Sequence, residues 1–138
     1  MLHLIKLAVG IDDIDHLLDR QRVNKNGYIE HRTRMMPKRE AELLDGGSMY
    51  WVIRGFIQAR RPLVALRQGK DANGKSICII EMEPKLVLVQ PRAQRAFQGW
   101  RYLQRDSAPL DIKGNFKSYV DPQMPKEMRL ELLRLGLI

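Results

Sequence analysis

The sequence has little sulfur chemistry and no metal-binding pattern. Of its 138 residues only Cys78 is a cysteine, which excludes an internal disulfide and any metal cage built from several cysteines. The three histidines, His3, His16 and His31, are scattered along the chain without the spacing that metal ligands need. We therefore expect no metal site, and a lone cysteine in an apolar run fits a protein of the reducing cytoplasm.

Long apolar runs and the common nucleotide-binding motifs are also missing. The longest apolar runs, such as Leu86–Val89, are much shorter than the roughly 20 residues of a membrane-spanning helix. The chain contains no P-loop, no Gly-x-Gly-x-x-Gly fingerprint and no Gly-x-Ser-x-Gly nucleophile elbow. These absences argue against a membrane protein and against nucleotide-driven chemistry, and we expect no cofactor.

Acidic residues are absent from two stretches, Gly46–Lys70 and Pro84–Arg105, although both stretches are rich in bases. They account for all of the net charge of +8, because the rest of the chain has slightly more acids than bases. Aromatic residues are interleaved with these bases, namely Tyr50, Trp51, Phe56, Phe97, Trp100 and Tyr102. This arrangement is typical of surfaces that bind phosphates and stack on bases, and it indicates a nucleic-acid partner.

Hydrophobic alternation and turn signals predict many strands and few helices. Strands are predicted over residues 2–9, 28–35, 48–60, 63–67, 76–82, 86–90 and 99–103, and helices over 12–21, 38–44 and from Pro125 onward. Gly55 predicts a bend or bulge within the strand over 48–60, and Pro62 predicts an interruption after it. The turn Asp71–Gly74 predicts a hairpin, and residues 106–123 are predicted to be mostly loop.

The length of the chain predicts a single domain over residues 1–138, with a real core. Connections between the central strands are too short to hold the crossover helices of a parallel sheet. The predicted fold class is therefore α+β, a small, mostly antiparallel β-barrel with two or three flanking helices. We expect Trp51 to lie in the core and Trp100 to be exposed.

Four segments carry a resemblance to a known family. They are Arg34–Arg39 (RMMPKR), Glu42–Gly55 (ELLDGGSMYWVIRG), Glu83–Val87 (EPKLV) and Phe97–Leu103 (FQGWRYL). With them the chain resembles, over nearly its whole length, a bacterial family known as domain of unknown function 1489. The resemblance implies no activity and assigns no catalytic or binding residue.

A second similarity concerns the order of the elements. A short helix that ends in Gly46-Gly47 before a strand containing Trp51 is similar to the PUA-like superfamily, including its ASCH and EVE branches. This resemblance implies a small PUA-like β-barrel that is linked to RNA. Some ASCH-type proteins hydrolyse modified nucleosides with a lysine, a threonine and a glutamate, for which Lys38, Thr33 and Glu81 are candidates by residue type alone.

We predict that the protein binds RNA and has no chemistry of its own. Basic side chains would contact phosphates and aromatic rings would stack on an unpaired base, with helix amides after Pro37 adding to an anion site. The residues predicted to bind nucleic acid are Arg32, Arg34, Lys38, Arg39, Tyr50, Arg54, Arg60, Arg61, Trp100, Arg101 and Tyr102.

Two other functions stay open at this point. One is a hydrolase or nuclease that acts on a modified nucleoside or on RNA, with Lys38, Thr33 and Glu81 in its pocket. The other is a protein-interaction adaptor whose basic face meets an acidic partner. A closed pocket with a buried lysine and carboxylate would favour the enzyme, an open basic groove with exposed aromatics would favour the binder, and a flat basic face would favour the adaptor.

Overall fold

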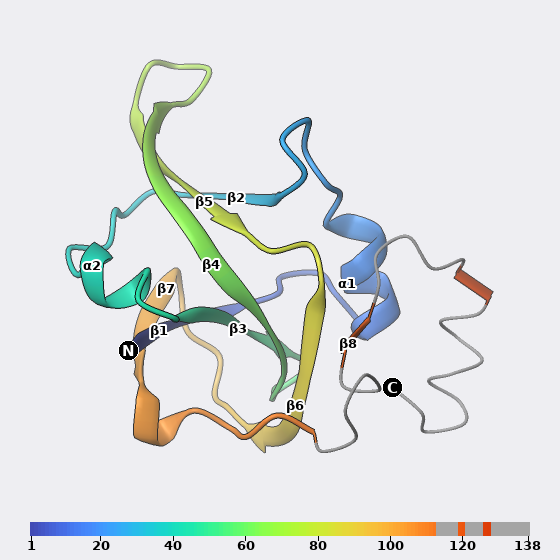
Figure 1. Ribbon diagram of the computed structural model, residues 1–138. Helices are drawn as coiled ribbons and strands as arrows, with labels where there is room; N and C mark the ends of the chain where they lie inside the picture. Colours follow the sequence, from blue (N-terminus) through green and yellow to red (C-terminus); the bar gives the residue numbers. More distant parts are fainter. Residues whose placement is uncertain (113–118, 121–125, 128–138) are drawn as a thin grey trace.

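The computed structural model of the chain describes residues 1–112, 119–120 and 126–127 (Figure 1). In chain order its elements are β1 (Leu2–Leu7), α1 (Ile14–Arg20), β2 (Ile29–Thr33), α2 (Glu40–Leu43), β3 (Ser48–Ile53), β4 (Phe56–Lys70), β5 (Ser76–Met82), β6 (Leu86–Ala93), β7 (Trp100–Gln104), a 3-10 turn (Arg105–Ser107) and β8 (Tyr119–Val120). The helix predicted from Pro125 onward lies outside the described residues, apart from 126–127.

The described strands form one mixed, mostly antiparallel sheet, as the sequence predicts. Its main path runs β2-β5-β4-β3-β1-β7, and the pairing of β1 with β3 is parallel. The long strand β4 connects the parts of this sheet, because its first half pairs with β3 and β6 and its second half pairs with β5. The predicted hairpin at Asp71–Gly74 is confirmed as the connection between β4 and β5.

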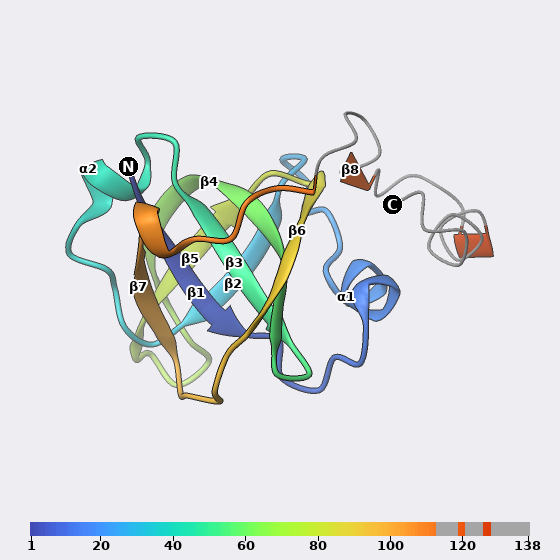
Figure 2. The same cartoon turned by 90° about the horizontal axis from the view of Figure 1, so that it is seen from below.

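The sheet curls strongly, as Figure 2 shows, but the predicted barrel is not confirmed. Its two end strands are β2 and β7, and no strand pairing among the described residues joins them. Side chains of β7 instead reach the segment that follows β2. The indole Nε1 of Trp100 donates to the carbonyl of Met35 at 2.7 Å, and the hydroxyl of Tyr102 accepts from the amide of Lys38 at 2.9 Å.

The strand predicted over residues 48–60 is wrong, because the chain reverses at Arg54-Gly55. Both residues have positive φ, 49° at Arg54 and 83° at Gly55, and together they form the two-residue hairpin between β3 and β4. Positive φ is uncommon for arginine, so Gly55 alone predicted a bend instead of a complete reversal.

Pro62 does not interrupt a strand, contrary to the prediction, and lies inside β4. It sits where β4 passes from its pairing with β6 to its pairing with β5. The carbonyl of Pro62 accepts from the amide of Glu83 at 2.9 Å, at the corner between β5 and β6. A residue without an N–H is tolerated here because the ladder changes partner at this point.

Two apolar clusters lie on the two faces of the sheet. The larger cluster includes Trp51, which is 2% exposed, so the predicted core position of this residue is confirmed. The smaller cluster contains Tyr50 and Val52 of β3 and lies on the other face of that strand. Gly47 precedes β3 at a point where an added Cβ would lie 2.1 Å from the carbonyl oxygen of Leu2, so β3 and β1 approach too closely there for any larger residue.

Helix α1 covers one end of the larger cluster (Figure 1). Its Leu17 and Leu18 are buried, and Asp13 caps its first turn by accepting from the amide of His16 at 2.8 Å. In the described part of the chain, no helix has the length and apolar character needed to cross a bilayer.

Candidate functional site

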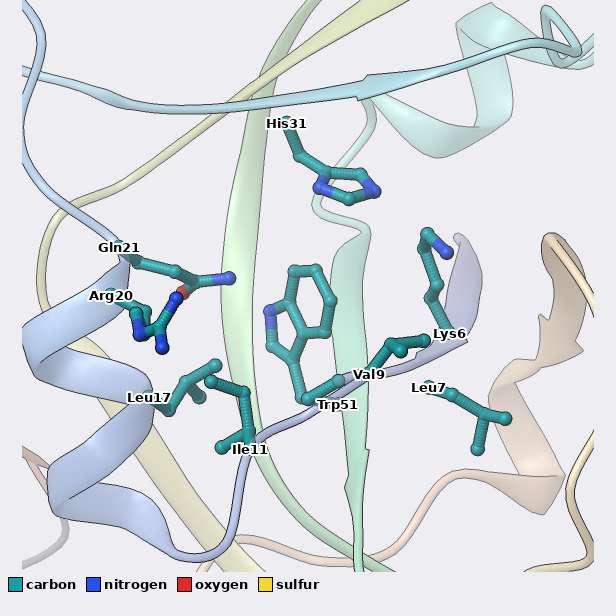
Figure 3. Close-up of a pocket in the computed structure, with 10 residues that line it drawn as sticks. Lys6, Leu7, Val9, Ile11, Leu17, Arg20, Gln21, His31 and Trp51 are labelled. Carbon is teal, nitrogen blue, oxygen red and sulfur yellow. The ribbon is translucent and has the colours of Figure 1, made fainter.

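A pocket of about 210 Å³ lies where β1 ends and α1 begins to cover the sheet (Figure 3). Four elements supply its walls: the end of β1 and the turn after it, the last part of α1, and single residues of β2 and β3. The lining residues are Lys6, Leu7, Ala8, Val9, Ile11, Leu17, Arg20, Gln21, His31 and Trp51.

Backbone hydrogen bonds place these walls. The amide of Ala8 donates to the carbonyl of Val52 at 2.9 Å, which keeps the chain beside β3 just beyond β1. The amide of Ile11 donates to the carbonyl of Ala8 at 3.2 Å, and Gly10 between them has a positive φ of 75°. This tight turn brings α1 back, so that Arg20 and Gln21 face the indole of Trp51 (Figure 3).

Two buried nitrogen atoms beside the pocket have no hydrogen-bond partner among the described residues. They are Nε1 of Trp51 and Nε2 of His31. The two rings meet edge to face, with centroids 5.4 Å apart. A buried polar group without a partner costs roughly 1 to 3 kcal/mol, so a partner from outside the chain would be favourable at this place.

Burial keeps His31 neutral. Burial, together with the nearby ammonium of Lys6, lowers the pKa of the imidazole to about 4. Burial also lowers the pKa of Lys6. Lys6 and Arg20 lie at the pocket, and neither has an ion pair or a side-chain hydrogen bond within the part of the chain that the structure describes.

Arg61 was predicted to contact phosphate, and the structure contradicts this role. The side chain is completely buried and serves the interior of the protein. Its Nε donates to Oε1 of Gln21 at 2.7 Å, and its Nη1 donates to the carbonyls of Glu83 and Pro84. Because the oxygen of Gln21 is occupied in this way, the amide nitrogen of that side chain is the end that points toward Trp51 (Figure 3).

A second hollow, of about 480 Å³, is called the Phe97 hollow below. It shares Lys6, Leu7 and Val9 with the first. Its other wall is the loop over residues 96–99, which contributes the half-buried ring of Phe97. The guanidinium carbon of Arg101, a predicted binding residue, lies 4.7 Å from the centroid of this ring. The guanidinium lies over this ring as a cation–π contact, and a nucleic-acid base can stack on the outer plane of such a guanidinium.

Most of the other predicted arginines form ion pairs with carboxylates of the same chain. The pairs are Arg32 with Glu30 at 3.4 Å, Arg34 with Asp71 at 2.6 Å, Arg39 with Glu42 at 2.6 Å, Arg54 with Asp12 at 3.6 Å, and Arg60 with Asp111 at 2.8 Å. The guanidinium of Arg34 holds the pKa of Asp71 below its usual value, and Arg39 does the same for Glu42. Lys38 is exposed and has no ion pair within the described ranges.

The aromatic residues predicted to stack on a base make internal contacts instead. Tyr50 is only 4% exposed and meets the ring of His3 edge to face. Trp100 is half-buried, contrary to the expected exposure, and its ring packs edge to face on Tyr102 with centroids 4.9 Å apart. Trp100 and Tyr102 also form hydrogen bonds with the segment after β2, so these two rings hold the ends of the sheet together.

Replacing Trp100 with alanine should therefore lower the free energy of unfolding by about 2 to 3 kcal/mol, through lost packing and a lost hydrogen bond. Trp100→Phe keeps most of the packing and should cost only about 1 kcal/mol. Urea unfolding measures both. A Trp100→Ala protein of normal stability whose RNA affinity has dropped would show instead that this ring stacks on RNA.

The candidate catalytic residues are not brought together. Thr33 pairs with Cys78 and Glu81 pairs with Glu30, so Thr33 and Glu81 point to opposite faces of the sheet. The carboxylate of Glu81 accepts from Nε of Arg67 at 3.2 Å and from Nδ2 of Asn24 at 3.3 Å. This arrangement does not support a site built from Lys38, Thr33 and Glu81.

The residues of the pocket are not among those predicted to bind, because they come from distant positions of the chain, 6, 20, 21, 31 and 51. One local signal was present. Lys6 interrupts the apolar strand Leu2–Leu7, and a cation on a strand with a largely buried face needs an explanation. Neither Arg20 nor Gln21 stands out in the sequence, since a polar end is ordinary for a helix.

Comparison with known proteins gives a family and nothing further. The model of a family described as "Protein of unknown function (DUF1489)" matches residues 4–138. No curated protein and no solved structure matches the chain.

Proposed function

The chain belongs to the DUF1489 family of proteins of unknown function, and we propose that it binds RNA through the two hollows at the end of β1. The observation that carries this proposal is the position of Lys6 and Arg20. These cations lack an acidic partner among the described residues and lie at a pocket that adjoins the Phe97 ring.

The two hollows suit two different parts of a nucleotide. The pocket between α1 and Trp51 offers cations and neutral N–H groups, which are the groups that contact phosphate. The neighbouring hollow is mainly apolar and offers the Phe97 ring with the guanidinium of Arg101 over it, a layered surface that suits a base. RNA is favoured over duplex DNA because stacking on a protein ring needs an unpaired base.

The paired arginines have a secondary role in this proposal. Arg32, Arg34, Arg39, Arg54 and Arg60 each already bind a carboxylate of the chain, so a phosphate would have to compete with that carboxylate for them. They therefore contribute to the net positive field of the protein, whereas no acid among the described residues competes for Lys6 and Arg20.

We also propose that the curled sheet is a barrel of the PUA-like kind. The mostly antiparallel pairing and the bridge from β7 to the segment after β2 support this assignment. A cytoplasmic location is proposed as well, and the buried, unpaired thiol of Cys78 supports it.

The test of RNA binding is a salt titration with single-stranded RNA, followed by fluorescence anisotropy. We expect log K to fall linearly with log salt, by about 0.7 for each phosphate contact. The double variant Lys6→Gln/Arg20→Gln should bind more weakly and should reduce the slope by about 1.4, since two contacts are lost.

Arg34→Gln/Arg54→Gln is the matched control, because it removes the same charge from two arginines that already have acidic partners. This control should change the slope of log K against log salt much less than Lys6→Gln/Arg20→Gln does. Equal losses in the two double variants would show a diffuse basic surface, and no binding of RNA at low salt would contradict the proposed function. Tighter binding of single-stranded DNA than of RNA would contradict the choice of RNA.

A further inference from the structure

The pocket between α1 and Trp51, from here on the α1 pocket, is lined by polar side chains that are mostly hydrogen-bond donors. Lys6 and Arg20 can only donate, the indole of Trp51 can only donate, and no carboxylate of the described residues lines the pocket. Gln21 also presents its donating end, because its oxygen already accepts from Arg61 at 2.7 Å. Among the described side chains of the lining, the remaining acceptors are the neutral imidazole of His31 and the second lone pair of the Gln21 oxygen.

A ligand that matches this lining has acceptors and no donors. The Watson–Crick edge of every common base carries at least one N–H or NH₂ group, which would face donors in this pocket, and only the N7/O6 edge of guanine offers acceptors alone. A phosphate group in its ionised form carries acceptor oxygens alone. The negative charge of a phosphate monoester, about −1.5 to −2 at neutral pH, also matches the two cations.

The buried indole of Trp51 is an independent sign of a ligand. The residue is 2% exposed, and its Nε1 has no partner among the described residues although it lies on the side facing Arg20 and Gln21 (Figure 3). A phosphate oxygen or a water held by phosphate would satisfy this donor, and the same holds for Nε2 of His31 when it carries the proton.

The walls of the pocket also bear on which phosphate fits. Residues of β1, α1, β2 and β3 surround it, and it adjoins the Phe97 hollow through Lys6, Leu7 and Val9. A phosphate inside a chain has a nucleotide on both sides, whereas a terminal phosphate needs room on one side only. The lining carries two cations, Lys6 and Arg20, and a terminal monoester carries up to two negative charges whereas a phosphodiester inside a chain carries one, so the charge favours a terminal phosphate.

We infer that the α1 pocket holds the terminal phosphate monoester of a nucleotide, whose base lies in the Phe97 hollow. This inference rests on the proposed function and deepens it, because it makes the protein a reader of phosphorylated ends. The monoester has two possible sources, the end of an RNA chain and a free mononucleotide, and the experiment separates them.

The experiment uses the whole chain and short single-stranded RNAs of one sequence that carry a 5′-phosphate, a 3′-phosphate or hydroxyls at both ends. We expect one of the phosphorylated forms to bind at least tenfold tighter than the form with two hydroxyl ends. The advantage should disappear in Lys6→Gln/Arg20→Gln and persist in the control Arg34→Gln/Arg54→Gln. Thermal unfolding of each variant shows that the comparison is made between folded proteins.

Competition by uridine and adenosine monophosphates and by inorganic phosphate identifies the source. A phosphorylated RNA that binds at least tenfold tighter than either monophosphate indicates an RNA end, and equal affinities indicate the free nucleotide.

The outcomes separate this inference from the proposed function. Equal binding of all three RNAs would overturn the inference and leave RNA binding in place. Binding of monophosphates without any binding of RNA would keep the phosphate pocket and overturn the proposed function. If neither the RNAs nor the monophosphates bind, both are wrong. Because the three RNAs are compared on the unmodified protein, the result does not depend on whether a variant folds.

Discussion

Alanine in place of Arg61 is expected to lower the free energy of unfolding by about 3 to 5 kcal/mol. The side chain is completely buried and donates to Gln21 and to the carbonyls of Glu83 and Pro84. The substitution leaves a cavity and removes the donor from all three of these oxygens. Burial also lowers the pKa of Arg61 to about 10, so the guanidinium stays charged at neutral pH.

Arg54→Ala is the matched control for this substitution. Arg54 is exposed and has a single ion pair at 3.6 Å, so its loss should change stability by less than about 1 kcal/mol. Urea unfolding at pH 7 gives both values. A stable Arg61→Ala protein that has lost RNA affinity would restore the phosphate contact predicted from the sequence.

Acidification is expected to destabilise the protein by about 3 kcal/mol through His31 alone. Burial lowers the pKa of this histidine from 6.5 to about 4, so the unfolded chain binds the proton more readily than the folded one. The stability linked to His31 is therefore complete above pH 6.5 and falls as the pH drops toward 4. Below pH 4 both states are protonated and the loss stops growing.

Urea unfolding between pH 8 and pH 4, with the wild type and His31→Phe, measures this effect. The variant cannot take up the proton, so its stability should fall much less between pH 6.5 and pH 4.5. Burial also lowers the pKa of His3, and this contribution is the same in both proteins, so the difference between their slopes reports His31. Identical slopes in the two proteins would show that His31 does not take up a proton in this range.

Local patterns in the sequence predict most strands and both described helices, because each feature depends on neighbouring residues. Alternation marks β1 and β2, and Asp71–Gly74 has the residues that a hairpin needs. The two wrong predictions, the unbroken strand over 48–60 and the interruption at Pro62, concern residues that depart from their usual backbone preferences. Arg54 adopts a positive φ beside Gly55, and Pro62 lies in a strand at the point where the strand changes partner.

The binding surface could not be predicted in the same way, because charge along a sequence does not reveal distant partners. Arg60 pairs with an aspartate 51 residues later, and Arg34 with one 37 residues later. The stretches without acids therefore look unpaired in the sequence and are partly neutralised in the fold. Lys6 and Arg20 show the reverse, since acids lie near them in the chain and no ion pair forms within the described residues.

The position of β1 between β3 and β7 has a consequence for protein synthesis. β1 is made first, but its partners are completed only at residues 53 and 104. At about 5 to 20 residues per second, the ribosome needs roughly 5 to 20 s to add the remaining residues up to the end of β7. β3 can pair with one edge of β1 early in this time, whereas the other edge of β1 has no partner until β7 is made. During synthesis this open edge of β1 can pair with the strand of another chain, and the arrival of β7 closes it.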